Sequence, residues 1–249
     1  MTTFDAHPRS SLIVALDFDS LSTALNFAKQ VSGLVGMFKI GSQLFTSAGP
    51  DAVRQVAQLG TDIFLDLKFH DIPNTVAGAV LASAAMPGVQ LVNVHALGGA
   101  AMMRAAAQAA SAGVPMGADR TRLLAVTVLT SMDHKAIREV GLGGPPQSRA
   151  VKLAKLAQQA GVDGVVASVQ EAKAIRKACG REFLIVTPGV RPRGSDVGEK
   201  KDDQARTATP REAIKAGADF IVVGRPILMA ADPKSAIGEI VDEIALAKS

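Results

Sequence analysis

The sequence contains no tryptophan and no tyrosine, and it has a single cysteine, Cys179. A lone cysteine cannot close a disulfide within the chain, which excludes the disulfide-stapled class of small secreted domains and favours a reducing cytoplasm. We interpret Cys179 as a small residue at a helix end rather than as a nucleophile. Because 48% of the residues are hydrophobic and only 4% are aromatic, we expect a sizeable core of aliphatic side chains.

Long apolar runs and strong charge are also missing. No uncharged apolar run reaches the ~18 residues that a membrane span needs, and residues 1–10 lack the basic and apolar regions of a signal peptide. The formal net charge is only +4, and the one locally basic segment, 191–201, is interrupted by Asp196 and Glu199. These features exclude a nucleic-acid footprint and favour a small anionic ligand.

Signatures of metals and cofactors are absent from the sequence as well. There is no glycine-rich nucleotide fingerprint, and neither His70 nor His95 has partners at metal-ligand spacing. Isolated histidines near strand ends usually satisfy local hydrogen bonds, so we assign neither a catalytic role. We therefore expect a reaction that uses no metal and no organic cofactor.

What the chain does contain is a regular alternation of strand-like apolar runs and helical segments. We predict strands at 12–16, 37–41, 91–95, 123–129, 164–167, 183–186 and 220–223, and a further strand that begins at 63–65 and carries Asp66. Predicted helices are 21–31, 52–59, 76–85, an alanine-rich segment to about 112, 134–140, 148–160, 170–178, 210–216 and 233–247. Such units indicate a parallel sheet covered by helices. Eight of them in 249 residues favour a closed (β/α)8 TIM barrel, with 1–249 as a single domain, over a doubly wound sheet.

The stretch after the third strand carries the spacing D-x-K-x-x-D, formed by Asp66, Lys68 and Asp71. In an extended strand Asp66 and Lys68 point to the same side, about 7 Å apart at roughly 3.3 Å of rise per residue. The pattern is also typical of a surface salt bridge at a strand end. The buried strand before it and the helix after it favour a functional site.

If the barrel is correct, the carboxyl ends of its strands share one face, where barrel enzymes place their chemistry. The polar residues predicted there are Asp17, Lys39, Asp66, Lys68, His95, Thr130, Arg191 and Arg225. Loops after the seventh and eighth strands, a common phosphate site, hold Arg191 and the pair Gly224-Arg225, with Gln204 between them. Glycine admits backbone N–H groups close to an anion, and arginine supplies a forked donor. We favour phosphate binding over the alternative that Gly-Arg-Pro is only a helix-start turn.

Taken together, these motifs resemble the orotidine 5'-phosphate decarboxylase family, in its bacterial form, over nearly the whole chain. The matching segments are Ala15-Leu16-Asp17, Phe38-Lys39-Ile40-Gly41, Asp66 to Val76, Val126 to Ser131, Thr187 to Pro192, Asp202-Asp203-Gln204 and Val223 to Pro226. The D-x-K-x-x-D spacing by itself is only moderately specific, because related sugar-phosphate barrels have a similar spacing. The seven segments in this order make the match specific.

The resemblance implies decarboxylation of orotidine 5'-phosphate to UMP, the last step of de novo pyrimidine biosynthesis, without metal or cofactor. It implies that the catalytic residues Lys39, Asp66, Lys68 and Asp71 form a charged network at the reacting carbon C6. Lys68 would stabilise the developing negative charge and then protonate C6, and Asp66 would lie near the departing carboxylate. Asp71 would come from the neighbouring subunit of a cytoplasmic homodimer with shared active sites.

The resemblance also implies a set of substrate contacts. Asp17 and Lys39 would bind the ribose hydroxyls, Thr130 would face the pyrimidine, and Thr75 would reach across from the partner subunit. The phosphate would be held in the loops after the seventh and eighth strands. The full set of substrate-binding residues is Asp17, Lys39, Asp66, Asp71, Thr75, Thr130, Pro188, Arg191, Gln204, Gly224 and Arg225.

Two alternative functions stay open at this point. One is a metal-dependent sugar-phosphate lyase of the same barrel type, which the extended 66–76 stretch and the Pro-Gly-Val-Arg-Pro loop argue against. The other is a non-catalytic barrel that binds a phosphate ligand. The intact set of acidic and basic residues argues against it, because a protein that only binds its ligand does not need like charges buried close together.

Overall fold

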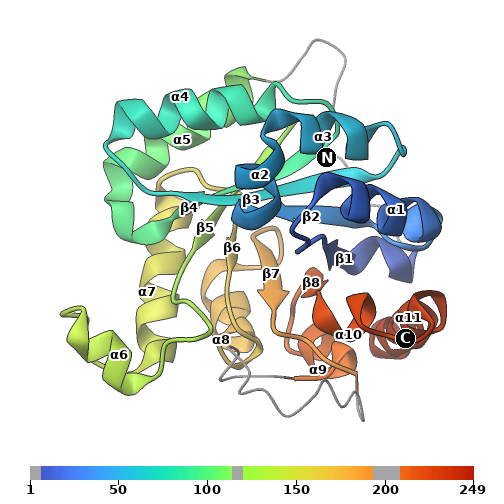
Figure 1. Ribbon diagram of the computed structural model, residues 1–249. Helices are drawn as coiled ribbons and strands as arrows, with labels where there is room; N and C mark the ends of the chain where they lie inside the picture. Colours follow the sequence, from blue (N-terminus) through green and yellow to red (C-terminus); the bar gives the residue numbers. More distant parts are fainter. Residues whose placement is uncertain (1–6, 114–119, 193–207) are drawn as a thin grey trace.

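The computed structural model describes residues 7–113, 120–192 and 208–249. Within these residues, eight parallel strands hydrogen-bond in chain order and close into a barrel in which β8 pairs with β1 (Figure 1). The strands are β1 Leu12–Ala15, β2 Met37–Gly41, β3 Asp62–Phe69, β4 Val89–His95, β5 Arg122–Val126, β6 Gly164–Val166, β7 Leu184–Pro188 and β8 Phe220–Val223. The predicted (β/α)8 barrel is confirmed.

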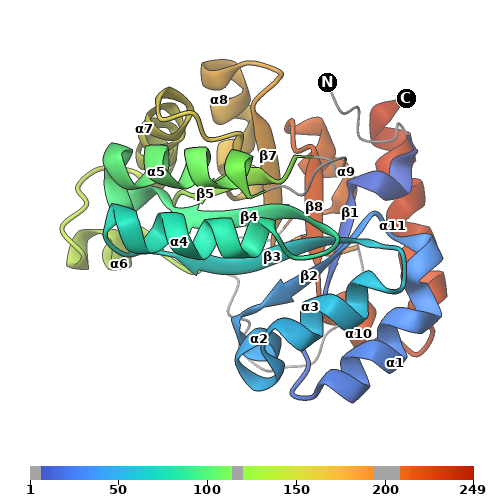
Figure 2. The same ribbon diagram turned by 90° about the horizontal axis from the view of Figure 1, so that it is seen from above.

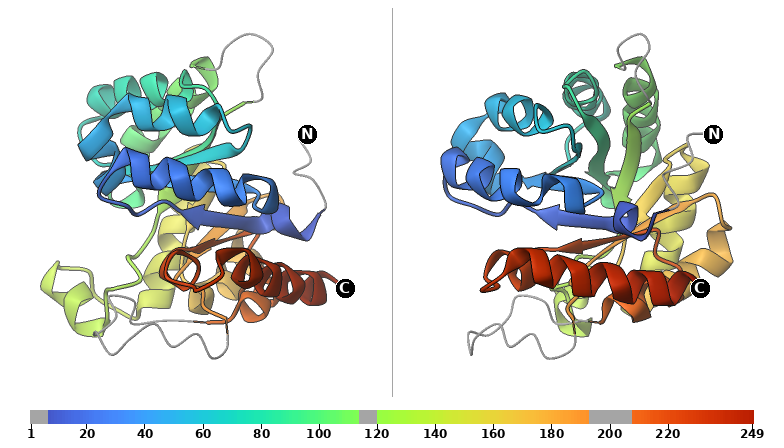
Figure 3. Two further views of the ribbon diagram at one scale, coloured as in Figure 1. Left: turned by 45° about the vertical axis from the view of Figure 1, so that its right-hand side comes forward. Right: turned by 90° about the vertical axis from the view of Figure 1, so that its right-hand side faces the viewer.

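Helices cover the outside of the barrel. They are α1 Leu21–Val31, α2 Ser42–Ala48, α3 Pro50–Ala57, α4 Pro73–Ala84, α5 Gly99–Ala112, α6 His134–Glu139, α7 Pro146–Gln159, α8 Val169–Cys179, α9 Pro210–Lys215, α10 Arg225–Leu228 and α11 Pro233–Lys248. Helices α4 and α5 lie side by side next to β3 and β4 (Figure 2). The long C-terminal helix α11 lies along the β1 side of the barrel (Figure 3).

Helix starts follow the local sequence. Ser20 caps α1 by accepting a hydrogen bond from the Thr23 N–H. At α9, Thr209 accepts from the Glu212 N–H while the Glu212 carboxylate accepts from the Thr209 N–H, and Pro210 occupies the first helical position. This reciprocal cap satisfies two N–H groups that a helix start leaves without partners.

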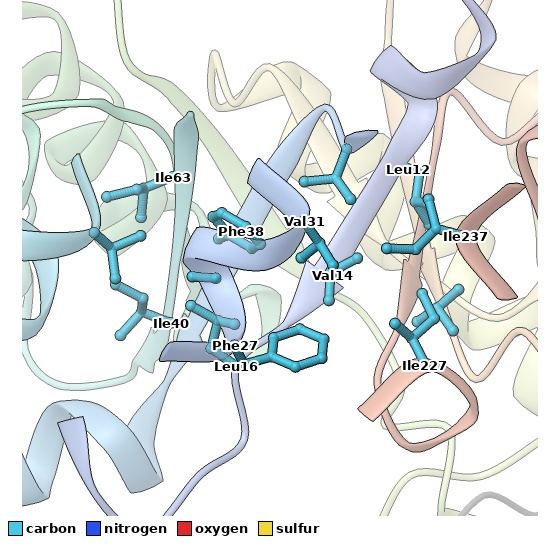
Figure 4. Close-up of a cluster of buried hydrophobic side chains, with 14 of the residues drawn as sticks. Leu12, Val14, Leu16, Phe27, Val31, Phe38, Ile40, Ile63, Ile227 and Ile237 are labelled. Carbon is cyan, nitrogen blue, oxygen red and sulfur yellow. The ribbon is translucent and has the colours of Figure 1, made fainter. Parts of the chain in front are cut away.

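Two apolar layers hold the barrel together. Inward side chains such as Met37, Phe64 and Leu91 fill its interior. Outward side chains of β1, β2 and β3 pack against the covering helices (Figure 4). The labelled members of this outer cluster are Leu12, Val14, Leu16, Phe27, Val31, Phe38, Ile40, Ile63, Ile227 and Ile237. Because side chains alternate along a strand, residues 39, 66 and 93 stand directly above the interior layer, towards the carboxyl ends of β2, β3 and β4.

The structure corrects the sequence prediction in three places. The helix predicted at 52–59 is preceded by a second one, α2, and Gly49 with φ 62° makes the sharp turn between α2 and α3. Strand β5 ends at Val126 rather than at residue 129. Arg225 begins the short helix α10, so the segment Gly224-Arg225-Pro226 is a helix start. The same three residues also line the cavity described below.

Within the described ranges, no helix combines the length and the apolar character that crossing a bilayer requires.

Candidate active site

A cavity of about 630 Å³ opens at the carboxyl ends of the strands, on the face predicted for the chemistry. Strands and loops from most of the barrel contribute to its wall. The predicted site residues that line it are Asp17, Lys39, Asp66, Lys68, Thr130, Pro188, Arg191, Gly224 and Arg225. Gln204, the remaining predicted phosphate ligand, lies outside the described residues.

Four charged side chains of alternating sign form a continuous network on the β1–β3 side of this cavity. The Lys39 Nζ lies 3.1 Å from Asp17 Oδ1 and 3.4 Å from Asp66 Oδ2. The Lys68 Nζ lies 2.7 Å from Asp66 Oδ1. Lys39 and Asp66 are buried at the base of the network, whereas Asp17 and Lys68 reach the opening.

The network keeps its buried members charged. Burial alone would raise the pKa of Asp66, but the charges of Lys39 and Lys68 and the hydrogen bonds it accepts outweigh that effect and hold the pKa below its ordinary value. Burial alone would lower the pKa of Lys39, and the carboxylates of Asp66 and Asp17 instead raise it above its ordinary value. Oriented charges are therefore in place at the base of the cavity before any ligand arrives.

The backbone at Lys68 departs from the regular strand expected from sequence. Lys68 has φ 52°, and among the described residues it is the one non-glycine residue with positive φ. The pairing of β3 with β4 shifts register between Leu65 and Phe69, around this residue. Asp66 and Lys68 do share a side, and their side chains meet, with Lys68 Nζ 2.7 Å from Asp66 Oδ1.

Asn93, a residue that the sequence analysis did not single out, lies beside this irregularity. It is fully buried on β4, its Nδ2 donates to Asp66 Oδ1 at 2.7 Å, and its Oδ1 accepts from the Lys68 N–H at 2.8 Å. The signal in the sequence was an amide side chain within the otherwise apolar strand Leu91–Val94.

Two histidines stand next to the network. The His70 and His95 rings are 5.4 Å apart between centroids. Burial, together with the nearby charges of His70 and Lys68, lowers the pKa of His95 below its ordinary value, against the opposing charge of Asp66. His95 is therefore disposed to be neutral at pH 7 and does not add a further positive charge to the network.

The β7–β8 side of the cavity is built differently. Arg191 follows β7 and Arg225 begins α10 after β8, and both line the cavity together with Pro188 and Gly224. Burial and the charge of Arg225 lower the pKa of Arg191. Both guanidinium groups can donate charge-assisted hydrogen bonds to an anion bound at this side, which fits the phosphate predicted here.

Asp71 and Thr75, by contrast, are not among the residues that line the cavity. Both are exposed at the start of α4, where Asp71 Oδ1 accepts a hydrogen bond from the Ile72 N–H at 2.6 Å. The neighbouring Ile72 is 66% exposed, an unusual position for a large apolar side chain. Within one chain, the third charge of D-x-K-x-x-D is thus separate from the first two.

Two further residues of the site were missed from sequence. Gln43, on α2, lines the cavity and donates to Asp19 Oδ1 at 2.6 Å. Gly41 leaves room for the network, because a Cβ at this position would lie 2.9 Å from Lys39 Nζ. Gln43 could not be placed without α2, and the need for glycine at position 41 depends on where Lys39 points.

In the parts of the chain that the structure describes, no group of three or more His, Cys, Asp or Glu side chains is arranged to hold a metal ion.

Comparison with known proteins gives one consistent family. The model of the orotidine 5'-phosphate decarboxylase / HUMPS family matches residues 10–240. The orotidine 5'-phosphate decarboxylase of Trichlorobacter lovleyi is 53% identical over 236 residues, which cover 95% of each protein. Among solved structures, the orotidine 5'-phosphate decarboxylase of Lactobacillus acidophilus matches with a TM-score of 0.80 and 40% identity, over 94% of this chain and 98% of the other. That from Pyrococcus horikoshii matches with a TM-score of 0.72 and 25% identity, over 94% of this chain and 99% of the other.

Proposed function

Because the chain belongs to the orotidine 5'-phosphate decarboxylase / HUMPS family, we propose that it converts orotidine 5'-phosphate to UMP and CO₂, the final step of UMP biosynthesis. The observation that carries the proposal is the alternating network of Asp17, Lys39, Asp66 and Lys68 in a cavity that two arginines after β7 and β8 also line. The network suits a reacting carbon that becomes negative, and the arginines suit a phosphate.

The chemistry is electrostatic. When the bond between C6 and the carboxylate breaks, CO₂ leaves and the electron pair stays on C6. The ammonium group of Lys68 stabilises that charge and then transfers a proton from Nζ to C6, while Asp66 lies near the departing carboxylate. Charges that are fixed in place before the reaction need little reorganisation as the negative charge develops.

The remaining cavity residues hold the substrate. Asp17 and Lys39 bind the ribose hydroxyls, Thr130 faces the pyrimidine, and Pro188, Arg191, Gly224 and Arg225 form the phosphate end with Gln204. The phosphate is remote from C6, so the binding energy it provides serves to position the ring against Lys68.

Asp71 and Thr75 complete the site from a second copy of the chain in a homodimer. Their exposure outside the cavity of their own chain supports this assignment, as does the exposed Ile72 between them. Mixing inactive Asp66→Asn and Asp71→Asn variants should restore activity, because one of the two hybrid sites then contains both aspartates. A mixture that exchanges subunits and stays inactive would contradict shared sites.

The direct test of the function is a decarboxylation assay. Purified protein should remove the orotate absorbance of orotidine 5'-phosphate, with the same rate in the presence and absence of a chelator. No loss of absorbance would reject the function. A rate abolished by chelator and restored by Mg²⁺ would instead favour the metal-dependent sugar-phosphate lyase, which the named relatives do not support.

We further propose that residues 1–249 act as one barrel domain in the cytoplasm. The closed ring of strands, with β1 paired to β8, supports one domain, and the single cysteine supports a reducing compartment.

A further inference from the structure

We propose that Asn93 is a positioning residue for this reaction, holding Lys68 at its backbone and, through Asp66, at its ammonium group. The proposal rests on the decarboxylase function given above. It adds a residue that acts on the substrate only through Asp66 and Lys68. It follows from two hydrogen bonds, a strained backbone and a register shift that all meet at one buried amide.

The first contact is with the backbone of Lys68. Asn93 Oδ1 accepts from the Lys68 N–H at 2.8 Å, at the point where β3 loses regular pairing with β4. The left-handed conformation of Lys68, φ 52°, is unfavourable for a residue with a Cβ and persists only where the surroundings enforce it. The Asn93 side chain takes the place of the backbone acceptor that a regular strand would supply.

The second contact is with the carboxylate that pairs with Lys68. Asn93 Nδ2 donates to Asp66 Oδ1 at 2.7 Å, and the same oxygen accepts from Lys68 Nζ at 2.7 Å. The other carboxylate oxygen, Oδ2, lies 3.4 Å from Lys39 Nζ. Both oxygens of Asp66 therefore have partners. Asn93 binds the backbone N–H of Lys68 directly, and it also binds the Asp66 carboxylate that pairs with the Lys68 ammonium group.

An amide suits this position because it offers one acceptor and one donor on the same planar group. The acceptor is needed for the Lys68 N–H and the donor for the Asp66 carboxylate. Aspartate at this position has the same shape and keeps the acceptor, but it donates to Asp66 only when it is protonated. That difference makes the role measurable through pH.

The principal experiment measures kcat of Asn93→Asp relative to wild type from pH 8 to pH 5. At pH 8 the ionised side chain repels Asp66, and we expect kcat to be lower by about 100-fold, the cost typical of an ångström-scale misplacement. Because a nearby carboxylate raises the pKa of the new acid, it becomes protonated as the pH falls and again donates to Asp66. The ratio of variant to wild-type kcat should therefore rise at least about tenfold towards pH 5.

Taking the ratio separates this effect from the other titrating groups near position 93. These groups are Lys39 on β2, Asp66 and Lys68 on β3, His95 on β4 and, beyond it, His70, and all are present in both proteins. A ratio that stays flat across the range, or a kcat equal to that of wild type at pH 8, would overturn the positioning role.

A second variant distinguishes positioning from simple stability. Asn93→Leu removes both hydrogen bonds at similar volume, and we expect kcat to fall about 100-fold with KM and the Kd for UMP nearly unchanged. Thr121→Val is the matched control, because it removes a buried side-chain hydrogen bond to Val89 O, at the other end of the strand that carries Asn93. It should alter melting temperature without altering kcat.

The outcomes of this second experiment are distinct. Loss of UMP binding in parallel with kcat in Asn93→Leu, or an equal kcat loss in Thr121→Val, would mean that Asn93 only supports the fold. A wild-type protein without turnover would reject the decarboxylase function and this proposal with it. An active wild type whose Asn93 variants keep its kcat would reject only this proposal.

Discussion

On the β1–β3 side of the cavity positive and negative side chains alternate, whereas on the β7–β8 side two arginines lie close together. In the first region each buried charge has an opposite neighbour within 3.4 Å, which keeps Asp66 ionised and Lys39 protonated. In the second region burial and the charge of Arg225 lower the pKa of Arg191. The first region pairs opposite charges within the protein, and the second presents two guanidinium groups that can donate to a bound anion. We therefore assign catalysis to the first and substrate capture to the second.

The largest effect that tests this division is expected from Lys68→Ala. In the proposed mechanism the variant loses both the charge that stabilises C6 and the proton donor, so kcat should fall by at least about 10⁴-fold. UMP should still bind, because the arginines are intact. Measuring kcat and the Kd for UMP, with the exposed Lys29→Ala as a control, checks both statements. Substantial residual turnover in Lys68→Ala would mean that the proton donor has been misassigned.

Removing an arginine should give the opposite pattern. Arg225→Ala loses charge-assisted hydrogen bonds worth about 1.5–3 kcal/mol, so kcat/KM for orotidine 5'-phosphate should fall by roughly 10- to 150-fold, mainly through KM. The same variant should treat orotidine, which lacks the phosphate, as wild type does. An equal loss with both substrates would break the assignment of this side to the phosphate.

A smaller effect is expected where the network is crowded without losing a charge. In Gly41→Ala the new Cβ would lie 2.9 Å from Lys39 Nζ and 3.5 Å from Asp17 Oδ1, so Lys39 must move. The end of a lysine moves at little cost, and we expect an unchanged melting temperature with kcat lower by about tenfold. Gly33→Ala, where a Cβ meets nothing within 4 Å, is the control. Normal turnover in Gly41→Ala would show that the spacing of the network is not critical.

The division between the two sides also explains which parts of the site were visible in the sequence. Asp17, Lys39 and Asp66 follow apolar strand residues, and the period of two along a strand places them above the barrel interior. The arginines follow β7 and β8, where barrels commonly bind phosphate. These residues were predictable because strand direction alone brings them to one face.

Other features depend on contacts that no local pattern encodes. Nothing in the sequence marks Lys68 for a left-handed conformation, since lysine has no preference for it. Asn93 resembles an ordinary core amide until its two partners on β3 are known. Asp71 belongs to the same motif as Asp66 and Lys68, yet the turn into α4 carries it away from the cavity. Only the family resemblance suggested that it serves a neighbouring subunit.

The smallest expected effect concerns stability in acid, and it also separates the two sides. Because the folded-state pKa of Asp66 is depressed, its contribution to stability is fully present above the unfolded pKa of about 3.9 and is lost as the pH falls through the folded value. One such group adds at most about 1.4 kcal/mol per pH unit to the slope. Urea unfolding between pH 5 and pH 2.5 should therefore give a shallower acid slope for Asp66→Asn than for wild type, whatever its stability at pH 7. Arg225→Ala should keep the wild-type slope, because arginine stays protonated throughout this range. Equal slopes for Asp66→Asn and wild type would mean that the network does not hold Asp66 ionised, and the description of the β1–β3 side as a charge-balanced network would fail.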